Sequence, residues 1–252
     1  LTEAGQALAP GTREGFEALS AAWRSAKRLQ DTATLTVTSG PALTAKWLAP
    51  RLFKFATDHP EIELRFSATL RRIDLARDSV DVALRYGYGP DPGLFSRRVI
   101  EDWISPMMTP ELARTLSSPA DLRNATLFHA DDIRFLDPPV DWGAWFRAAG
   151  IGPVPSGGPR FGQSDHAIDA ALAGGGIVLG RSTFAAKALR EGRLVAPFPL
   201  ALTTKAHYRF LCLEGAETRP QVAAFLEWIL AEAKDLNDLW DGRQLVAAAD
   251  VP

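Results

Sequence analysis

The chain has 252 residues, of which 46% are hydrophobic and 23% are charged. This composition is that of a globular protein with enough apolar material for a buried core, and the length predicts one large or two small domains. The formal net charge of -2 argues against a bulk electrostatic attraction of these residues to DNA or to an anionic membrane.

A single cysteine, Cys212, lies in the apolar run Y-R-F-L-C-L and is expected to be a buried thiol. It cannot form an internal disulfide, so the chain shows no sign of an oxidising compartment. No apolar stretch reaches the length of a membrane span, and no leader peptide is recognisable. We therefore expect a cytoplasmic protein with no membrane partner; a secreted protein whose leader has been removed is the alternative.

Residues 2–29 are predicted to form one long helix, which begins at Thr2 and is interrupted and kinked at Pro10. Four residues recur along it at steps of three and four positions: Phe16, Leu19, Trp23 and Ala26. This spacing is a short heptad seam. It fits packing against the body of the same chain and dimerisation with a partner helix equally well.

From Thr34 the pattern becomes an alternation of strands and helices. Strands are predicted at residues 34–39, 61–68 and 80–86. A helix is predicted at 43–55, with Pro50 expected to kink or divide it, and a short helix or turn at 72–79. The order β-α-β-α-β predicts a parallel sheet covered by helices.

The second half of the chain continues in this style. Residues 97–108 are predicted to form one long strand, and alternating elements follow up to a helix at 220–233. Residues 235–252 are expected to be peripheral. Two extended stretches, around 97–108 and 197–204, join two β/α halves of similar size. A chain that crosses between two halves and returns predicts two lobes with a cleft between them.

No group of residues requires catalysis or a metal. The histidines have no zinc-ligand spacing, and Asp131-Asp132 is interpreted as a pair of solvated turn carboxylates. Ser164-Asp165-His166 contains the residue types of a catalytic triad, but consecutive helical residues point in different directions. Ser164 and Asp165 are interpreted as helix caps, at a positive helix end that suits a small anion. We predict a binding protein with no catalytic residue, no metal and no cofactor.

Polar residues gather at the predicted carboxyl edge of the first sheet, where open α/β sheets bind ligands. The segment S-G-P-A-L, from Ser39 to Leu43, ends one strand and opens a helix, and Arg85 ends another strand. The Arg85 guanidinium is suited to a ligand carboxylate. A structural salt bridge of Arg85 with Asp81 or Glu101 is the alternative.

Several segments resemble the LysR-type transcriptional regulators: L-T-E-A-G, P-A-L-T-A-K-W-L-A-P-R-L-F-K-F-A-T-D-H-P-E-I-E-L-R-F, R-I-D-L-A-R-D-S-V-D-V-A-L-R-Y-G and A-L-A-G-G-G-I-V-L-G-R. Within that family, the chain is similar to the glycine-cleavage and β-lactamase regulators, from Leu1 to about Ala233. The resemblance implies two Rossmann-like lobes with a hinge, like those of periplasmic solute-binding proteins. It also implies a small-molecule effector, a homodimer or homotetramer, and DNA binding through a winged helix-turn-helix upstream of Leu1.

On this resemblance we expect residues 1–30 to be the end of the wing and the linker helix. Lobe I is expected to contain 33–97 and 203–235, lobe II 98–202, and the C-terminal tail 236–252. Two other functions share the scaffold: a periplasmic-type solute-binding receptor and a small-acid lyase. The heptad seam speaks against the receptor, and the lyase needs an acid or base in the cleft, for which Asp165, His166 and His129 are candidates.

The resemblance also implies effector contacts in the cleft. The residue after Pro41 is commonly Ser or Thr in the family; here it is Ala42, so Ser39 or Thr44 is expected to supply the hydroxyl. Ser164 and Tyr208 match polar residues of the family's cleft, and Asp74 matches an acidic residue that affects regulation. The complete predicted effector-binding set is Ser39, Ala42, Leu43, Thr44, Asp74, Arg85, His129, Ser164, Asp165 and Tyr208. Relatives have F-D-S where this chain has F-G-Q, which implies a different effector.

Overall fold

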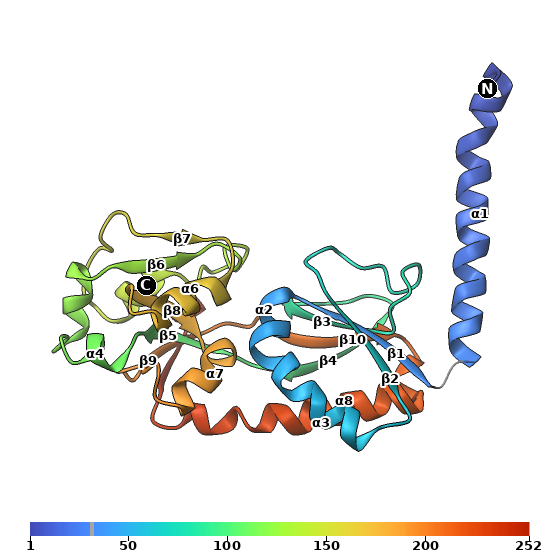
Figure 1. Cartoon of the computed structure of the whole chain (residues 1–252). Coiled ribbons are helices and arrows are strands. Elements are labelled where there is room, and N and C mark those ends of the chain that lie inside the picture. The colour runs from blue at the N-terminus through green and yellow to red at the C-terminus, as the bar shows by residue number, and fades with distance from the viewer. Residues whose placement is uncertain (31–32, 252) are drawn as a thin grey trace.

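The computed structural model describes residues 1–30 and 33–251, which form two α/β lobes and one projecting helix (Figure 1). The strands are β1 (Thr34–Ser39), β2 (Glu63–Ala68), β3 (Val82–Gly87), β4 (Leu94–Ile100), β5 (Trp103–Met107), β6 (Leu127–Ala130), β7 (Arg160–Phe161), β8 (Ile177–Arg181), β9 (Leu200–Thr203), β10 (His207–Leu213) and β11 (Gln244–Ala247). The helices are α1 (Glu3–Gln30), α2 (Pro41–Leu43), α3 (Ala49–Asp58), α4 (Pro110–Ala113), α5 (Trp142–Ala148), α6 (Ser164–Leu172), α7 (Ser182–Arg190) and α8 (Pro220–Lys234). Shorter helical turns are η1 (Thr44–Leu48), η2 (Pro119–Asn124), η3 (Ala216–Thr218), η4 (Asn237–Trp240) and η5 (Ala248–Asp250).

Lobe I is built on a five-stranded sheet of order β2-β1-β3-β10-β4. Strand β1 is parallel to β2 and β3, as predicted, but the segment between β2 and β3 forms turns and not a second helix. Strand β10 returns antiparallel between β3 and β4. The helix predicted around Pro50 is divided: a π-helical turn, η1, immediately precedes α3, which has Pro50 in its first turn. Proline cannot donate a backbone hydrogen bond, and the wider turn before it accommodates this loss.

Lobe II is built on a six-stranded sheet of order β11-β9-β5-β8-β6-β7. The prediction of one long strand at 97–108 is wrong. The chain leaves lobe I after β4 and enters lobe II with β5, and Glu101-Asp102 lies at the crossing. No proline or glycine marks this break in the sequence. Residues 98–100 therefore belong to the sheet of lobe I, and the boundary lies after Ile100.

The C-terminal segment is part of lobe II and not a peripheral tail. Strand β11 pairs in parallel with β9, from Gln244 opposite Leu200 to Ala247 opposite Thr203. The backbone thus passes between the lobes a third time, after α8, which packs on β1 and β4 of lobe I. Helix α7 of lobe II also packs against α2 and η1 of lobe I, and one hydrophobic core continues across this contact.

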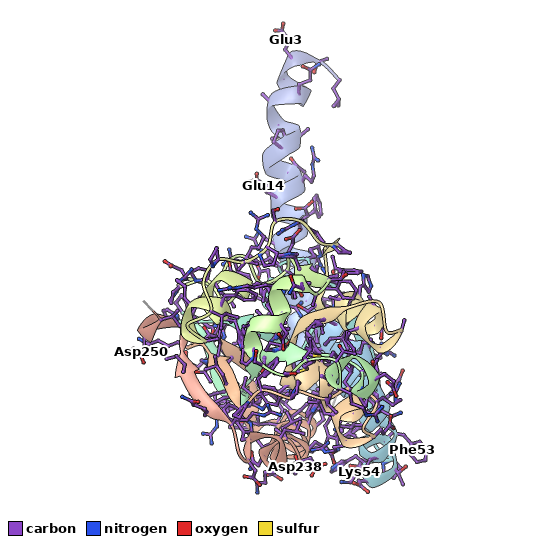
Figure 2. The ribbon with its side chains drawn as sticks, turned by 90° about the vertical axis from the view of Figure 1, so that its left-hand side faces the viewer. Glu3, Glu14, Phe53, Lys54, Asp238 and Asp250 are labelled. Carbon is purple, nitrogen blue, oxygen red and sulfur yellow. The ribbon has the colours of Figure 1, made fainter. Side chains whose placement is uncertain are left out.

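Helix α1 projects away from both lobes, as two perpendicular views show (Figures 1 and 2). It continues through Pro10, so the predicted interruption is absent. Phe16, Leu19 and Trp23 are 67%, 69% and 74% exposed, and Ala26 is exposed as well. The seam therefore does not pack on the body of its own chain, and its pairing with a partner helix stays a prediction.

Candidate functional site

A cavity of about 230 Å³ lies between the lobes. It is bounded by residues at the carboxyl ends of β1 and β3 in lobe I and of β6 and β8 in lobe II, which is where α/β sheets hold ligands. Its lining comprises Gly40, Pro41, Ala42, Leu43, Thr69, Leu70, Leu84, Arg85, Tyr86 and Tyr208 from lobe I, and Asp132, Phe135, Gln163, Arg181 and Phe184 from lobe II. Of the ten predicted effector-binding residues, Ala42, Leu43, Arg85 and Tyr208 line this cleft.

Arg85 brings a half-buried guanidinium to the cleft without a carboxylate partner among the described residues. Its nitrogen atoms donate to the carbonyl oxygen of Leu84 (3.1 Å) and to Oγ1 of Thr38 (3.3 Å). The alternative salt bridges are absent, because Asp81 pairs with Arg219 at 2.7 Å and Glu101 pairs with Arg98 at 2.6 Å. Burial lowers the pKa of Arg85, but an arginine stays charged at neutral pH. A ligand carboxylate can supply the counter-charge that this desolvated guanidinium lacks.

Arg181 supplies a second guanidinium, whose charge is already compensated. It is 3% exposed and forms hydrogen bonds of 3.0 and 2.6 Å with Oδ2 of Asp102, at the crossing between β4 and β5. Its guanidinium lies over the rings of Tyr86, Phe184 and Tyr208, with its central carbon 3.9, 4.6 and 5.1 Å from the ring centres. Tyr86 and Tyr208 belong to lobe I, so Arg181 braces the two lobes against each other at the cleft.

Asp132, interpreted from the sequence as a solvated turn residue, lines the cleft from lobe II. Its carboxylate accepts hydrogen bonds from the backbone N–H (3.1 Å) and from the hydroxyl (2.6 Å) of Ser164. The N-cap of α6 is Gln163, and neither Ser164 nor Asp165 caps the helix. The predicted anion site at this helix start is therefore filled by a carboxylate of the protein itself, and Ser164 lies behind Asp132, outside the cleft lining.

The other predicted residues also lie outside the cleft lining. Ser39 and Thr44 bond each other through their hydroxyls at 2.7 Å, and neither lines the cleft in place of the hydroxyl missing at Ala42. Asp74 is exposed and accepts bonds from the backbone of Ala76 and Arg77. Asp165 is buried, and its Oδ1 has no hydrogen-bond partner among the described residues.

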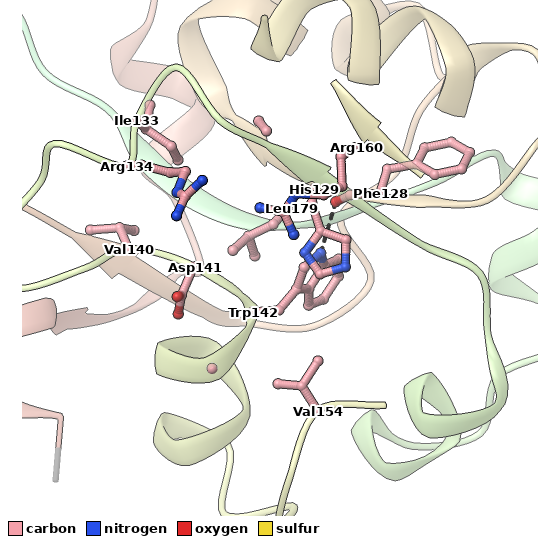
Figure 3. A pocket seen from close by; sticks show the side chains of 12 residues that line it. Phe128, His129, Ile133, Arg134, Val140, Asp141, Trp142, Val154, Arg160 and Leu179 are labelled. Atoms are coloured by element: carbon pink, nitrogen blue, oxygen red, sulfur yellow. Dashed lines mark hydrogen bonds between the residues drawn. The ribbon is translucent and has the colours of Figure 1, made fainter. Parts of the chain in front are cut away.

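His129 borders a second pocket, of about 400 Å³, inside lobe II (Figure 3). Its Nε2 lies 3.0 Å from the carbonyl oxygen of Gly157, and neighbouring Trp142 donates to the carbonyl oxygen of Phe128 at 2.8 Å. Arg160 at the rim pairs with Asp131 at 2.6 Å. His129 was expected in the cleft because it lies near the end of a strand. Successive residues of a strand face opposite sides of a sheet, and the His129 side chain faces the pocket inside lobe II instead.

Among the cleft residues that the sequence does not predict are Tyr86, Asp132, Arg181 and Phe184. Burial raises the pKa of Tyr86 and of Tyr208, so both hydroxyls stay protonated and can donate to a ligand. The hydroxyl of Tyr86 has no hydrogen-bond partner among the described residues. Asp165, His166 and His129, the candidates for lyase chemistry, are all absent from the cleft lining.

The described residues contain no cluster of three or more side chains suited to a metal ion. They also contain no helix that is both long and apolar enough to cross a membrane.

Two α/β lobes around a ligand-sized, charged cleft define a ligand-binding domain of the type II periplasmic-binding-protein-like fold. The model of the LysR substrate binding domain matches residues 28–234. The chain therefore belongs to the LysR family of transcriptional regulators, as an effector-binding domain.

Curated relatives and solved structures agree with this assignment. The glycine cleavage system transcriptional activator of Escherichia coli (strain K12) is 33% identical over 237 residues, which cover 92% of this chain and 76% of the relative. The transcriptional activator AmpR of Pseudomonas aeruginosa is 30% identical over 241 residues, with 92% and 77% coverage. The solved effector domain of that AmpR superposes with a TM-score of 0.66 over 82% of this chain and 99% of the domain, at 30% identity.

Proposed function

We propose that the chain senses a small metabolite in the interlobe cleft and transmits its binding to DNA-binding units of the same regulator. The observation that supports this most directly is Arg85, a half-buried guanidinium in the cleft without a carboxylate partner among the described residues. A ligand carboxylate is expected to bind there, since a planar guanidinium holds a carboxylate with two parallel hydrogen bonds.

Because the cleft is lined from both lobes, a ligand in it contacts both. A ligand changes the balance between two lobe arrangements only by the difference in its affinity for them. Arg181 of lobe II, clamped by Tyr86 and Tyr208 of lobe I, is the contact most directly affected by a change in lobe separation. In this proposal, helix α1 passes the change on to DNA-binding units of the helix-turn-helix type, and the regulator acts in the cytoplasm.

A thermal-shift screen tests this function. The library contains amino acids, small carboxylic acids and cell-wall muropeptides, with Tyr208→Phe and Ser164→Ala tested beside the wild type. At a hundredfold excess over its Kd, an effector adds about 2.7 kcal/mol and raises Tm by roughly 5–10 °C. We expect Tyr208→Phe to reduce this rise because it removes a hydroxyl from the cleft lining. If no compound stabilises the wild type, or stabilises it and Tyr208→Phe equally, cleft sensing is contradicted.

The exposed seam of α1 is proposed to join two copies of the chain. The double variant Phe16→Glu/Trp23→Glu places charges on two of its large apolar residues. We expect it to lower the sedimentation coefficient to that of a smaller species, because carboxylates directly opposite each other repel and apolar contact area is lost. The matched control is Glu14→Gln/Glu17→Gln, which changes charge on the same helix outside the seam. An unchanged profile of the seam variant argues against this interface.

A further inference from the structure

Three charged side chains line the interlobe cleft, and only two of them lack a compensating charge. Arg181 is neutralised by Asp102, its partner at 2.6 Å. Arg85 and Asp132 remain, and no salt bridge joins either of them to an opposite charge within the described part of the chain. The cleft therefore presents one cation and one anion that no ion pair neutralises; the anion is held at the start of α6 by hydrogen bonds from Ser164.

These two charges come from opposite lobes. Arg85 lies in β3 of lobe I, and Asp132 follows β6 of lobe II. Both oxygens of Asp132 accept from Ser164, which fixes the carboxylate in place and leaves lone pairs for a further donor. Ser164 is therefore a positioning residue behind Asp132. The nearby hydroxyl of Tyr86 is buried without a hydrogen-bond partner in the described structure and is a further unsatisfied group at the cleft.

The volume of the cleft indicates the size of the group that fits inside it. A cavity of about 150 Å³ is large enough to hold benzene, so the cleft's 230 Å³ accommodates roughly nine non-hydrogen atoms. Leu43, Leu70, Leu84 and Phe184 make part of its lining apolar. A molecule of this size carries the two charges and one short side chain.

We propose that the ligand of the cleft is a small zwitterionic amino acid, with its carboxylate on Arg85 and its ammonium group on Asp132. This assignment rests on the proposed function, since it names the class of effector. It also explains why residues of both lobes line the site, because each lobe binds one end of the ligand. A simple carboxylic acid satisfies Arg85 but leaves the partly buried Asp132 carboxylate without a cationic partner, so it forms one charge-assisted hydrogen bond fewer than an amino acid does.

Titration calorimetry on the chain tests the assignment with matched ligands. L-alanine and other small amino acids are compared with lactate and propionate, which lack the ammonium group, and with 2-aminopropanol, which lacks the carboxylate. We expect the best amino acid to bind at least about tenfold more tightly than any of these analogues, because each analogue loses a charge-assisted hydrogen bond.

Asp132→Asn then identifies the group that recognises the ammonium. We expect this variant to lose about tenfold in amino acid affinity and little in lactate affinity. Each variant is its own folding control, because the same sample is titrated with both ligands. Asp131→Asn, one residue earlier and paired with Arg160 outside the cleft, should keep the wild-type ratio.

The outcomes separate the assignment from the proposed function. If lactate or propionate binds as tightly as the amino acids, or if Asp132→Asn weakens both classes equally, the zwitterion is wrong while the cleft remains the effector site. A larger effector whose binding depends on Tyr208 also overturns the zwitterion and leaves the cleft as the effector site. If nothing from any class binds, both the assignment and the cleft as effector site are rejected.

Discussion

Asp102→Asn is expected to destabilise the protein by about 3–5 kcal/mol, the range for removing one partner of a buried ion pair. The Asp102 carboxylate is fully buried and accepts hydrogen bonds from Arg181, from the hydroxyl of Ser182 (3.1 Å) and from the backbone N–H of Thr183 (2.8 Å). Asparagine keeps the shape but leaves the Arg181 guanidinium buried without its counter-charge. The loss corresponds to a decrease of roughly 6–20 °C in Tm, measured without ligand.

Two comparisons isolate the charge effect. Glu101→Gln removes the adjacent carboxylate, whose pair with Arg98 is more than half exposed on the arginine side and should contribute at most about 1 kcal/mol. The double variant Asp102→Asn/Arg181→Met removes both buried charges and should recover much of the loss, because no uncompensated charge remains. A loss for Asp102→Asn no larger than that for Glu101→Gln means that this ion pair does not stabilise the crossing between the lobes.

The charged residues of the site lie at or just after the carboxyl ends of strands, and this position is the main signal that the sequence offers for them. Arg85 was predicted because it ends the strand V-A-L-R-Y at the carboxyl edge of a sheet. Arg181 ends the strand G-I-V-L-G-R, and Asp132 follows the strand L-F-H-A, so both also lie at the carboxyl edge of a sheet. They were missed because each had a sufficient local explanation, a glycine-rich turn in one case and a solvated acidic pair in the other.

The pairing of distant segments could not be predicted from local patterns. Asp102 and Arg181 are 79 positions apart, and nothing near either residue identifies the other. Strand β10 pairs with β3 and β4, more than a hundred positions earlier, so the assignment of strands to lobes depends on the whole fold. The break between β4 and β5 had only the charged pair Glu101-Asp102 as a signal, inside an otherwise strand-like run.

Arg85→Ala is expected to weaken effector binding about 100-fold. A guanidinium that holds a carboxylate through two charge-assisted hydrogen bonds contributes about 3 kcal/mol, which corresponds to this factor. The free protein should lose little stability. Burial desolvates the Arg85 guanidinium and lowers its pKa, and among the described residues only Leu84 and Thr38 accept its hydrogen bonds. A large loss of affinity with a small loss of stability is the result expected for a ligand-binding arginine.

Lys46→Ala is the matched control, because it also removes a cation near the junction of the lobes. Lys46 pairs with Asp169 of α6 at 2.5 Å but does not line the cleft. We expect its removal to change effector affinity less than about threefold, since the pair is largely exposed on the Asp169 side and contributes at most about 1 kcal/mol. Titration calorimetry with the effector found in the screen measures both variants. Arg85→Lys keeps the charge but loses the planar fork, so it should bind the effector with an affinity between those of the wild type and Arg85→Ala. Equal effector affinities for Arg85→Ala and Lys46→Ala would mean that Arg85 does not contact the effector.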